Sequence, residues 1–122
     1  MDLQIRVRTI DGVTILDVIG EVDLYTAPQL EEGLRKAAGA PAPLLAVNLS
    51  EVAYLDSTAL RVLTNLHKHV QERQGAMVVI AGQPTIQKIF RITGLGAVLH
   101  VVATEREAIE RLNVHPPSPP RG

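Results

Sequence analysis

The sequence predicts a single α/β domain with a mixed, mostly parallel sheet, helices packed against that sheet, and the element order ββαβαβαβα. The first observation is a pair of alternating apolar and polar segments, 3–9 and 13–19, joined by Asp11-Gly12, a dipeptide that favours a tight hairpin. The second is that two short apolar runs, 44–49 and 77–81, are each followed by residues with helical spacing. Strands that alternate with helices form parallel sheets through right-handed crossovers, so only the first strand should be antiparallel.

The first helix should follow a polar loop. Residues 20–26 carry a glycine and two acidic residues after the second strand, which indicates a loop. Thr26 and Gln29 have the spacing of a capping box, and Pro28 falls in the first turn, where proline is tolerated. The helix is therefore expected to run to about Ala38, before a segment rich in glycine and proline.

The second helix has the clearest pattern in the chain. From Ser57 to about Arg73, apolar residues recur on one face of a helix, namely Ala59, Leu63, Leu66 and Val70. This spacing predicts a helix that buries that face against the sheet. Gly75 is placed to act as its C-cap.

The remaining elements complete the alternation. A short helix is expected over residues 84–92, ended by Gly94, and a last strand over residues 98–102. Thr104 and Glu107 then form a second capping box, which opens the final helix.

The boundaries follow from these elements. We expect the domain to span residues 1–113, because 122 residues suit one domain with a real hydrophobic core. Residues 114–122 are rich in proline and can form neither a helix nor a strand ladder, so they are expected to be a disordered or extended tail.

Composition excludes several classes of function. Twelve basic and 13 acidic residues give a net charge of −1, so no basic field exists for nucleic acid or an anionic membrane. Aromatic residues make up only 2%, which is unfavourable for stacking on bases. Cysteine is absent, which removes disulfides, thiolate catalysis and thiolate metal sites. With neither a signal peptide nor an apolar run of membrane-spanning length, the chain is expected to be cytoplasmic.

Polar residues gather where strands end. In parallel sheets the loops from strand to helix lie at the carboxyl edge, so the expected loops 20–26, 50–57 and 82–84 should meet there. Asp56 suits the N-cap of the second helix, but the neighbouring Ser57 and Thr58 exceed what a helix start requires. We therefore expect these three residues to lie near Asp23 and Thr26.

Catalysis and metal binding are disfavoured by the motifs. Ser57 occupies a strand-to-helix turn, as a hydrolase nucleophile would, but it lacks the flanking glycines and an evident histidine base. "GLGAVL" at 94–99 stands between a helix and a strand, the reverse of a dinucleotide-binding fingerprint. His67 and His69 are two residues apart on a helix and point to different sides, so we expect one to be solvated and one to lie at the boundary of the core. No enzyme activity, cofactor or metal is expected.

The remaining interpretation of Ser57 is that of an acceptor for a phosphoryl group. A phosphate there would add about −2 charges at a helix N-terminus. The helix dipole would tolerate this charge, whereas Asp56 and Asp23 would oppose it. Phosphorylation would therefore make one edge of the domain sharply anionic without refolding it.

Three segments resemble the STAS domain family, and within it the anti-sigma factor antagonists, or anti-anti-sigma factors. They are "GEVDLYTAPQLEEGL", "VNLSEVAYLDSTALRVL" and "GAMVVIAGQPTIQKIFRITGL", and the resemblance extends over residues 3 to 113. Its most specific element is Asp56-Ser57-Thr58-Ala59-Leu60, followed by Gly20 to Asp23.

The resemblance implies a partner-switching role. Unmodified members of the family bind an anti-sigma factor with a histidine-kinase-like ATPase fold. This binding displaces the sigma factor that the anti-sigma factor holds. That partner phosphorylates the serine matching Ser57, which ends the complex, and a PP2C-type phosphatase restores it. This match, together with the expected position at the carboxyl edge of the sheet, gives six partner-binding residues: Asp23, Tyr25, Thr26, Asp56, Thr58 and Arg61. Tyr54 follows a buried strand and is expected to belong to the core.

Two positions depart from the family pattern. Ala59 and Arg61 stand where glycines are usual, and Arg61 lies one helical turn beyond Ser57, where it could pair with a phosphate. The alternatives are a STAS scaffold module that works without phosphorylation, in a signalling or transport complex, and a small-ligand or hydrolase domain.

Overall fold

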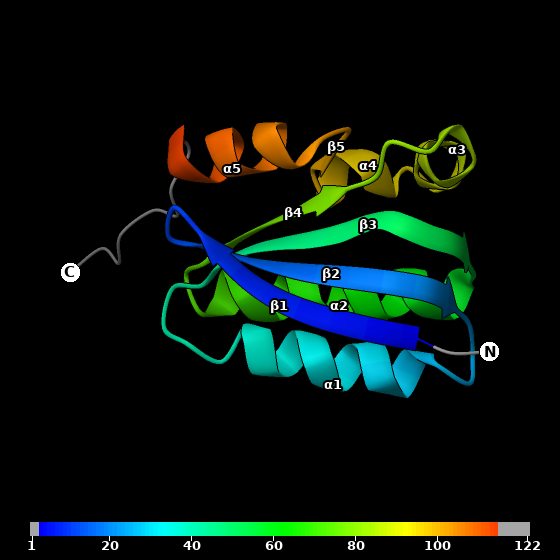
Figure 1. Ribbon diagram of the computed structural model, residues 1–122, viewed down its shortest axis with the longest axis horizontal. Coiled ribbons are helices and arrows are strands. Elements are labelled where there is room, and N and C mark those ends of the chain that lie inside the picture. Colours follow the sequence, from blue (N-terminus) through cyan, green and yellow to red (C-terminus); the bar gives the residue numbers. More distant parts are fainter. Residues whose placement is uncertain (1–2, 115–122) are drawn as a thin grey trace.

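The computed structural model describes residues 3–114 and contains a five-stranded sheet with helices on both faces (Figure 1). The strands are β1 (Leu3–Ile10), β2 (Val13–Val22), β3 (Leu44–Leu55), β4 (Ala76–Ile80) and β5 (Val101–Val102). The helices are α1 (Ala27–Ala37), α2 (Ser57–Glu72), α3 (Pro84–Thr93), α4 (Leu95–Val98) and α5 (Glu105–Val114). The tail expected at 114–122 lies outside the described residues from position 115 onward.

The topology confirms the predicted fold class. The strands lie in the order β1-β2-β3-β4-β5, in which β1 and β2 are antiparallel and every other neighbouring pair is parallel. The first hairpin turns at Asp11-Gly12, where both residues have positive φ angles, 51° and 79°. These angles are those of the turn type that asparagine, aspartate and glycine favour.

Two apolar layers hold the helices to the sheet. In Figure 1, α1 and α2 cover one face of the sheet and α5 covers the other. The larger layer includes the predicted face of α2, formed by Ala59, Leu63, Leu66 and Val70. The smaller layer packs Ala108 and Leu112 of α5 against the sheet residues Val13, Ile15, Ala46, Val78 and Ile80.

β2 and β3 extend further toward the carboxyl edge than the sequence predicted. The expected loops at 20–26 and 50–57 begin as strand, because β2 continues to Val22 and β3 to Leu55. These two residues are paired with each other, and both are buried. Of the two acidic residues that suggested the first loop, Glu21 lies on the paired part of β2, whereas Asp23 follows the strand as expected.

The strand predicted at 98–102 is wrong over its first part. The helix α4 occupies Leu95–Val98, and the Leu99 N–H donates to the Leu95 carbonyl oxygen at 2.9 Å. His100 then takes a φ of 54°, and only the two residues of β5 pair with β4. The observed order is therefore ββαβαβααβα. A short apolar run fits a buried helix end as well as a strand, so periodicity could not distinguish the two.

The capping box predicted at Thr26 is also wrong. Thr26 is the N-cap residue of α1, but its side chain makes no capping hydrogen bond. Gln29 instead donates from Nε2 to the carbonyl oxygen of Leu3 at 2.8 Å, which fastens α1 to β1.

Gly75 is needed for space rather than as the C-cap of α2. The C-cap residue is Arg73, and Gln74 takes the left-handed conformation with φ 61°. A Cβ on Gly75 would lie 2.3 Å from the carbonyl oxygen of Pro43, a distance that no packing tolerates. The glycine therefore allows the chain to pass close to the segment that leads into β3.

The predicted end of α3 is confirmed, and the predicted start of α5 is confirmed in part. Gly94 ends α3 in the left-handed conformation, with φ 74°. The Thr104 hydroxyl oxygen accepts from the Glu107 N–H at 3.2 Å, which is the first half of the capping box expected for α5. The Glu107 carboxylate accepts from the Thr104 hydroxyl at 3.2 Å and not from its backbone N–H.

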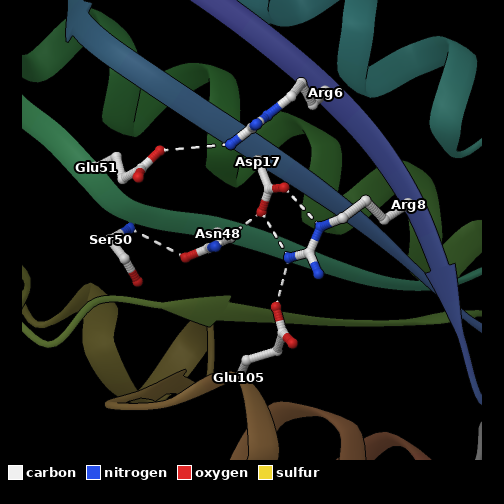
Figure 2. Close-up of polar contacts among 7 residues, drawn as sticks. All are labelled: Arg6, Arg8, Asp17, Asn48, Ser50, Glu51 and Glu105. Atoms are coloured by element: carbon white, nitrogen blue, oxygen red, sulfur yellow. Dashed lines mark hydrogen bonds and ion pairs between the residues drawn. The ribbon is translucent and has the colours of Figure 1, made fainter.

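A buried carboxylate links β1, β2 and β3 on the face that carries α5. Asp17 is 5% exposed and accepts from Arg8 Nε at 2.6 Å and from Arg8 Nη2 at 2.9 Å (Figure 2). Asn48 Nδ2 donates to the same carboxylate at 2.8 Å, and Arg8 also pairs with Glu105 at the start of α5. The hydrogen bonds from Arg8, with that from Asn48, hold the pKa of Asp17 below its ordinary value of 3.8.

Replacing Asp17 by asparagine is expected to destabilise the protein by about 1–3 kcal/mol at pH 7, because Arg8 loses its buried partner. The lowered pKa of Asp17 makes this contribution fully present above pH 3.8 and lost as the pH falls through the folded-state value. Urea unfolding of the wild type and Asp17→Asn should therefore differ at pH 7 and converge in acid.

The matched control is Glu51→Gln. Glu51 pairs with Arg6 at 3.7 Å, with both side chains more than half exposed (60% and 66%), so its loss should cost less than about 0.5 kcal/mol. A cost as large for Glu51→Gln as for Asp17→Asn would contradict the role given to the buried carboxylate.

Candidate functional site

The candidate site lies at the carboxyl edge of the sheet, where β2 and β3 end side by side (Figure 1, right). The Asp56 N–H donates to the carbonyl oxygen of Val22 at 3.2 Å, which joins the start of α2 to the end of β2. Asp23 and Asp56 thus directly follow two paired strand residues, Val22 and Leu55. The adjacency of these segments, expected from topology alone, is present in the structure.

Asp23 organises the loop before α1. Its Oδ1 accepts from the N–H groups of Tyr25 at 2.9 Å and Thr26 at 3.0 Å. The bond from the Thr26 N–H, followed by that from Tyr25, lowers the pKa of Asp23. The loop therefore presents a fixed carboxylate that is ionised at neutral pH.

Thr26 fixes this loop from inside. It is only 8% exposed, and its hydroxyl donates to the Glu21 carbonyl oxygen at 2.8 Å while accepting from the Asp23 N–H at 3.0 Å. A side chain with both hydrogen-bonding roles used inside the protein has little left to offer a partner. The geometry gives Thr26 a positioning role.

The start of α2 is capped by Asp56, as predicted. Its Oδ1 accepts from the N–H groups of Thr58 at 2.9 Å and Ala59 at 3.2 Å, and its backbone is extended. This arrangement satisfies two of the free N–H groups at the helix start. Asp56 and Thr58 are half-buried, whereas Ala59 packs into the core at 1% exposure.

Ser57 is the first residue of α2 and is exposed. Because Asp56 supplies the cap, the Ser57 hydroxyl is left free of that role; it takes part in no hydrogen bond found within residues 3–114. Its position at the N-terminus of a helix of 16 residues favours an anionic group there.

Exposed apolar side chains lie in the same two segments as these polar groups. Tyr25 is 88% exposed and Leu24 is 64% exposed, in the same loop as Asp23. Tyr54 was expected in the core, but it is 52% exposed and is the strand partner of Glu21. The prediction failed because β3 continues past its apolar run, and of its last four residues Val52 and Leu55 are buried whereas Ala53 and Tyr54 are exposed. Leu24 could have been found from the sequence, as an apolar residue next to Tyr25 in a polar loop.

Arg61 lies one turn after Ser57 on α2 and is exposed. Residues four apart on a helix are neighbours on its surface, so the guanidinium is within reach of a group attached to Ser57. No ion pair of Arg61 occurs among the residues that the structure describes.

Residues 3–114 contain no group of three histidine, cysteine, aspartate or glutamate side chains that could hold a metal ion. Within the same residues, none of the helices is both long enough and apolar enough to span a bilayer.

A family model and a curated relative both match most of this chain. The family model of the STAS domain matches residues 4–108. A protein of Listeria monocytogenes described as an anti-sigma-B factor antagonist is 33% identical over 107 residues, which cover 88% of this chain and 93% of that protein.

Solved structures share the same architecture. An anti-sigma factor antagonist from Mycobacterium paratuberculosis superposes with a TM-score of 0.85 at 28% identity, over 92% of this chain and 95% of that chain. The Bacillus cell fate determinant SpoIIAA, in its phosphorylated form, superposes with a TM-score of 0.67 over 91% of this chain and 99% of that one. At 22% identity, this second likeness shows the fold alone.

Proposed function

The chain belongs to the STAS domain family, and on this premise we propose that it is an anti-sigma factor antagonist controlled by phosphorylation of Ser57. In its unmodified form it binds an anti-sigma factor and thereby releases the sigma factor that this partner holds. Phosphorylation of Ser57 ends the complex, and a PP2C-type phosphatase resets it.

The observation that carries this proposal is the exposed Ser57 hydroxyl beside two fixed carboxylates. Asp56 caps the helix, so the serine is not needed to start α2. Asp23 lies on the adjacent loop, with its carboxylate held by backbone N–H groups. A phosphate on Ser57 would add about −2 charges to a surface that already carries these two acids, and a partner docked there would meet the added repulsion.

The partner is proposed to be an anti-sigma factor with a histidine-kinase-like ATPase fold that phosphorylates Ser57 itself. The loop between β2 and α1, residues 23–26, is called the docking loop. In it, Tyr25 and Leu24 supply exposed apolar area, and aromatic anchors dominate the binding energy of many interfaces. Asp23, Asp56 and Thr58 supply polar contacts around them, and Arg61 is the nearest cation on α2. Thr26 acts by holding the loop in shape.

Phosphorylation is tested by intact mass after incubation with ATP and the kinase recovered with the unmodified protein from native cell extract. Wild type should gain one phosphoryl group, and Ser57→Ala should gain none. Thr58→Ala is the matched control and should still gain one, because the Thr58 N–H that bonds Asp56 belongs to the backbone.

Either of two results would redirect the proposal. A phosphoryl group that persists in Ser57→Ala but disappears in Thr58→Ala would move the acceptor by one residue. A partner that binds tightly yet modifies neither residue would favour the phosphorylation-independent scaffold.

A further inference from the structure

A second polar region lies at the edge of the sheet opposite β1, beside the short edge strand β5. Because β5 pairs only with Val79 and Ile80, residues 76–78 of β4 have no strand on that side. A hollow of about 150 Å³ occupies this place, between the second half of α2 and the end of α5. It is lined by β4 residues and by His67, Gln71, His100, Arg111 and Leu112.

A second, wider hollow adjoins the first. Its volume is about 380 Å³, and it shares three lining residues with the first, His67, Gln71 and His100. Its other walls are α4 and the exposed side of α2, including Thr64 and Lys68. The histidine pair therefore stands between the two hollows, with an approach from solvent through the wider one.

His67 is a buried side chain, and one of its two ring nitrogens is buried without a hydrogen-bond partner among the described residues. The sequence predicted a solvated or boundary residue, but His67 is 8% exposed, and its Nδ1 is sealed from solvent with no hydrogen-bond partner among the described residues. Its ring meets that of His100 edge to face, with 6.1 Å between the centroids. Because Nδ1 is sealed, a group bound in either hollow would meet this ring at Nε2, which takes part in no hydrogen bond found within residues 3–114.

The donors around these histidines point to an anion. Arg111 Nη2 donates to His100 Nδ1 at 2.9 Å, which leaves the other guanidinium N–H groups and His100 Nε2 for a ligand, and Lys68 lines the wider hollow. Successive N–H groups of a strand alternate between its two neighbours, and those of Val79 and Ala81 donate toward the β5 side. The Met77 N–H therefore points to the same side, into the first hollow. No aspartate or glutamate lines either hollow.

We propose that this region is a binding site for a small oxyanion, a phosphate or a carboxylate, held by His67, His100 and Arg111. His67 comes from α2, Arg111 from α5 and His100 from the turn before β5, and all three line the first hollow. Oxyanions are commonly bound by several N–H donors that face one space. The site is separate from the carboxyl edge that carries Ser57, and it uses none of the residues proposed to contact the anti-sigma factor.

Binding should depend on pH. Burial lowers the pKa of His67, and burial together with the charge of Arg111 and the nearby His67 lowers the pKa of His100. The groups that face these rings are Lys68 and Gln71 of α2 and Arg111 of α5; β4 and α4 contribute only apolar side chains. A bound anion favours the protonated imidazoles, so binding should strengthen as the pH falls below about 6.5, the ordinary histidine value.

The test is a titration of the full chain with sodium phosphate, and separately with sodium acetate, at constant ionic strength set by sodium chloride. The imidazole signals of His67 and His100 are followed by NMR at pH 5.5 and pH 8. At least one of the two oxyanions should shift both signals to saturation, with half-saturation near about 1 mM at pH 5.5 and at least about tenfold weaker at pH 8. Comparison of the two anions separates a tetrahedral from a planar ligand.

Two internal controls make the result decisive. His69 lies on the same helix but lines a different hollow, between α1 and α2, so its signal should not follow the titration. Arg111→Gln should weaken binding at least about tenfold, whereas Arg106→Gln, which removes an exposed arginine of the same helix, should leave it unchanged. Shifts of His67 and His100 no larger than that of His69, or equal effects of the two arginine variants, would overturn the proposal.

Discussion

Tyr25→Ala is expected to weaken binding of the anti-sigma factor about 30-fold, which corresponds to about 2 kcal/mol. Tyr25 is 88% exposed, so its removal should cost the fold almost nothing and act on the interface alone. Its backbone N–H is bonded to the Asp23 carboxylate, so the side chain projects from a loop of fixed shape. A rigid aromatic anchor loses little freedom on binding, and for this reason such residues contribute strongly.

The affinity of Tyr25→Ala is measured by titration calorimetry beside Val7→Ala. Val7 is another exposed apolar residue, at 60%, but it lies in the middle of β1. Val7→Ala should bind as the wild type does, and circular dichroism should show both variants folded. An unchanged affinity for Tyr25→Ala would remove the docking loop from the interface.

Charge at position 57 should have an effect of similar size. Ser57→Asp is expected to bind the anti-sigma factor about tenfold more weakly than Ser57→Asn, which has the same shape without the charge. The added carboxylate would join Asp56 and Asp23 on the docking edge, whereas the helix N-terminus would tolerate it with a gain of about 0.3–1 kcal/mol in stability. The two variants should therefore separate affinity from stability.

This comparison is made by measuring the affinity and the thermal unfolding of both variants together. A loss of affinity with unchanged or raised stability identifies electrostatic repulsion at the interface. If Ser57→Asn lost as much affinity as Ser57→Asp, the shape of the side chain rather than its charge would be responsible.

The features that the sequence predicted well are those with local physical causes. The Asp11-Gly12 hairpin, the Asp56 cap and the apolar face of α2 each follow from a few neighbouring residues, and all three are present. The adjacency of Asp23 and Asp56 followed from one rule of parallel topology, because the strands that precede them are paired. The sequence therefore predicted which two segments meet at this edge.

The features that it missed depend on contacts between distant segments. Polar residues at the ends of β2 and β3 looked like loops, because their strand character comes from pairing with each other. Gly75 looked like a helix cap, but its reason is the carbonyl oxygen of Pro43, over thirty residues earlier. His67 looked like a solvated or boundary residue, since nothing in its own helix reveals that His100 and the end of α5 bury it.

The most direct test of the proposed switch is the affinity of the anti-sigma factor for the protein before and after phosphorylation of Ser57. Both forms are titrated under one set of ionic conditions, with the site of the phosphate verified by peptide mass. The phosphorylated form is expected to bind at least about 100-fold more weakly, because about −2 charges are added to an edge that already holds Asp23 and Asp56. Equal affinity of the two forms would contradict the proposed switch.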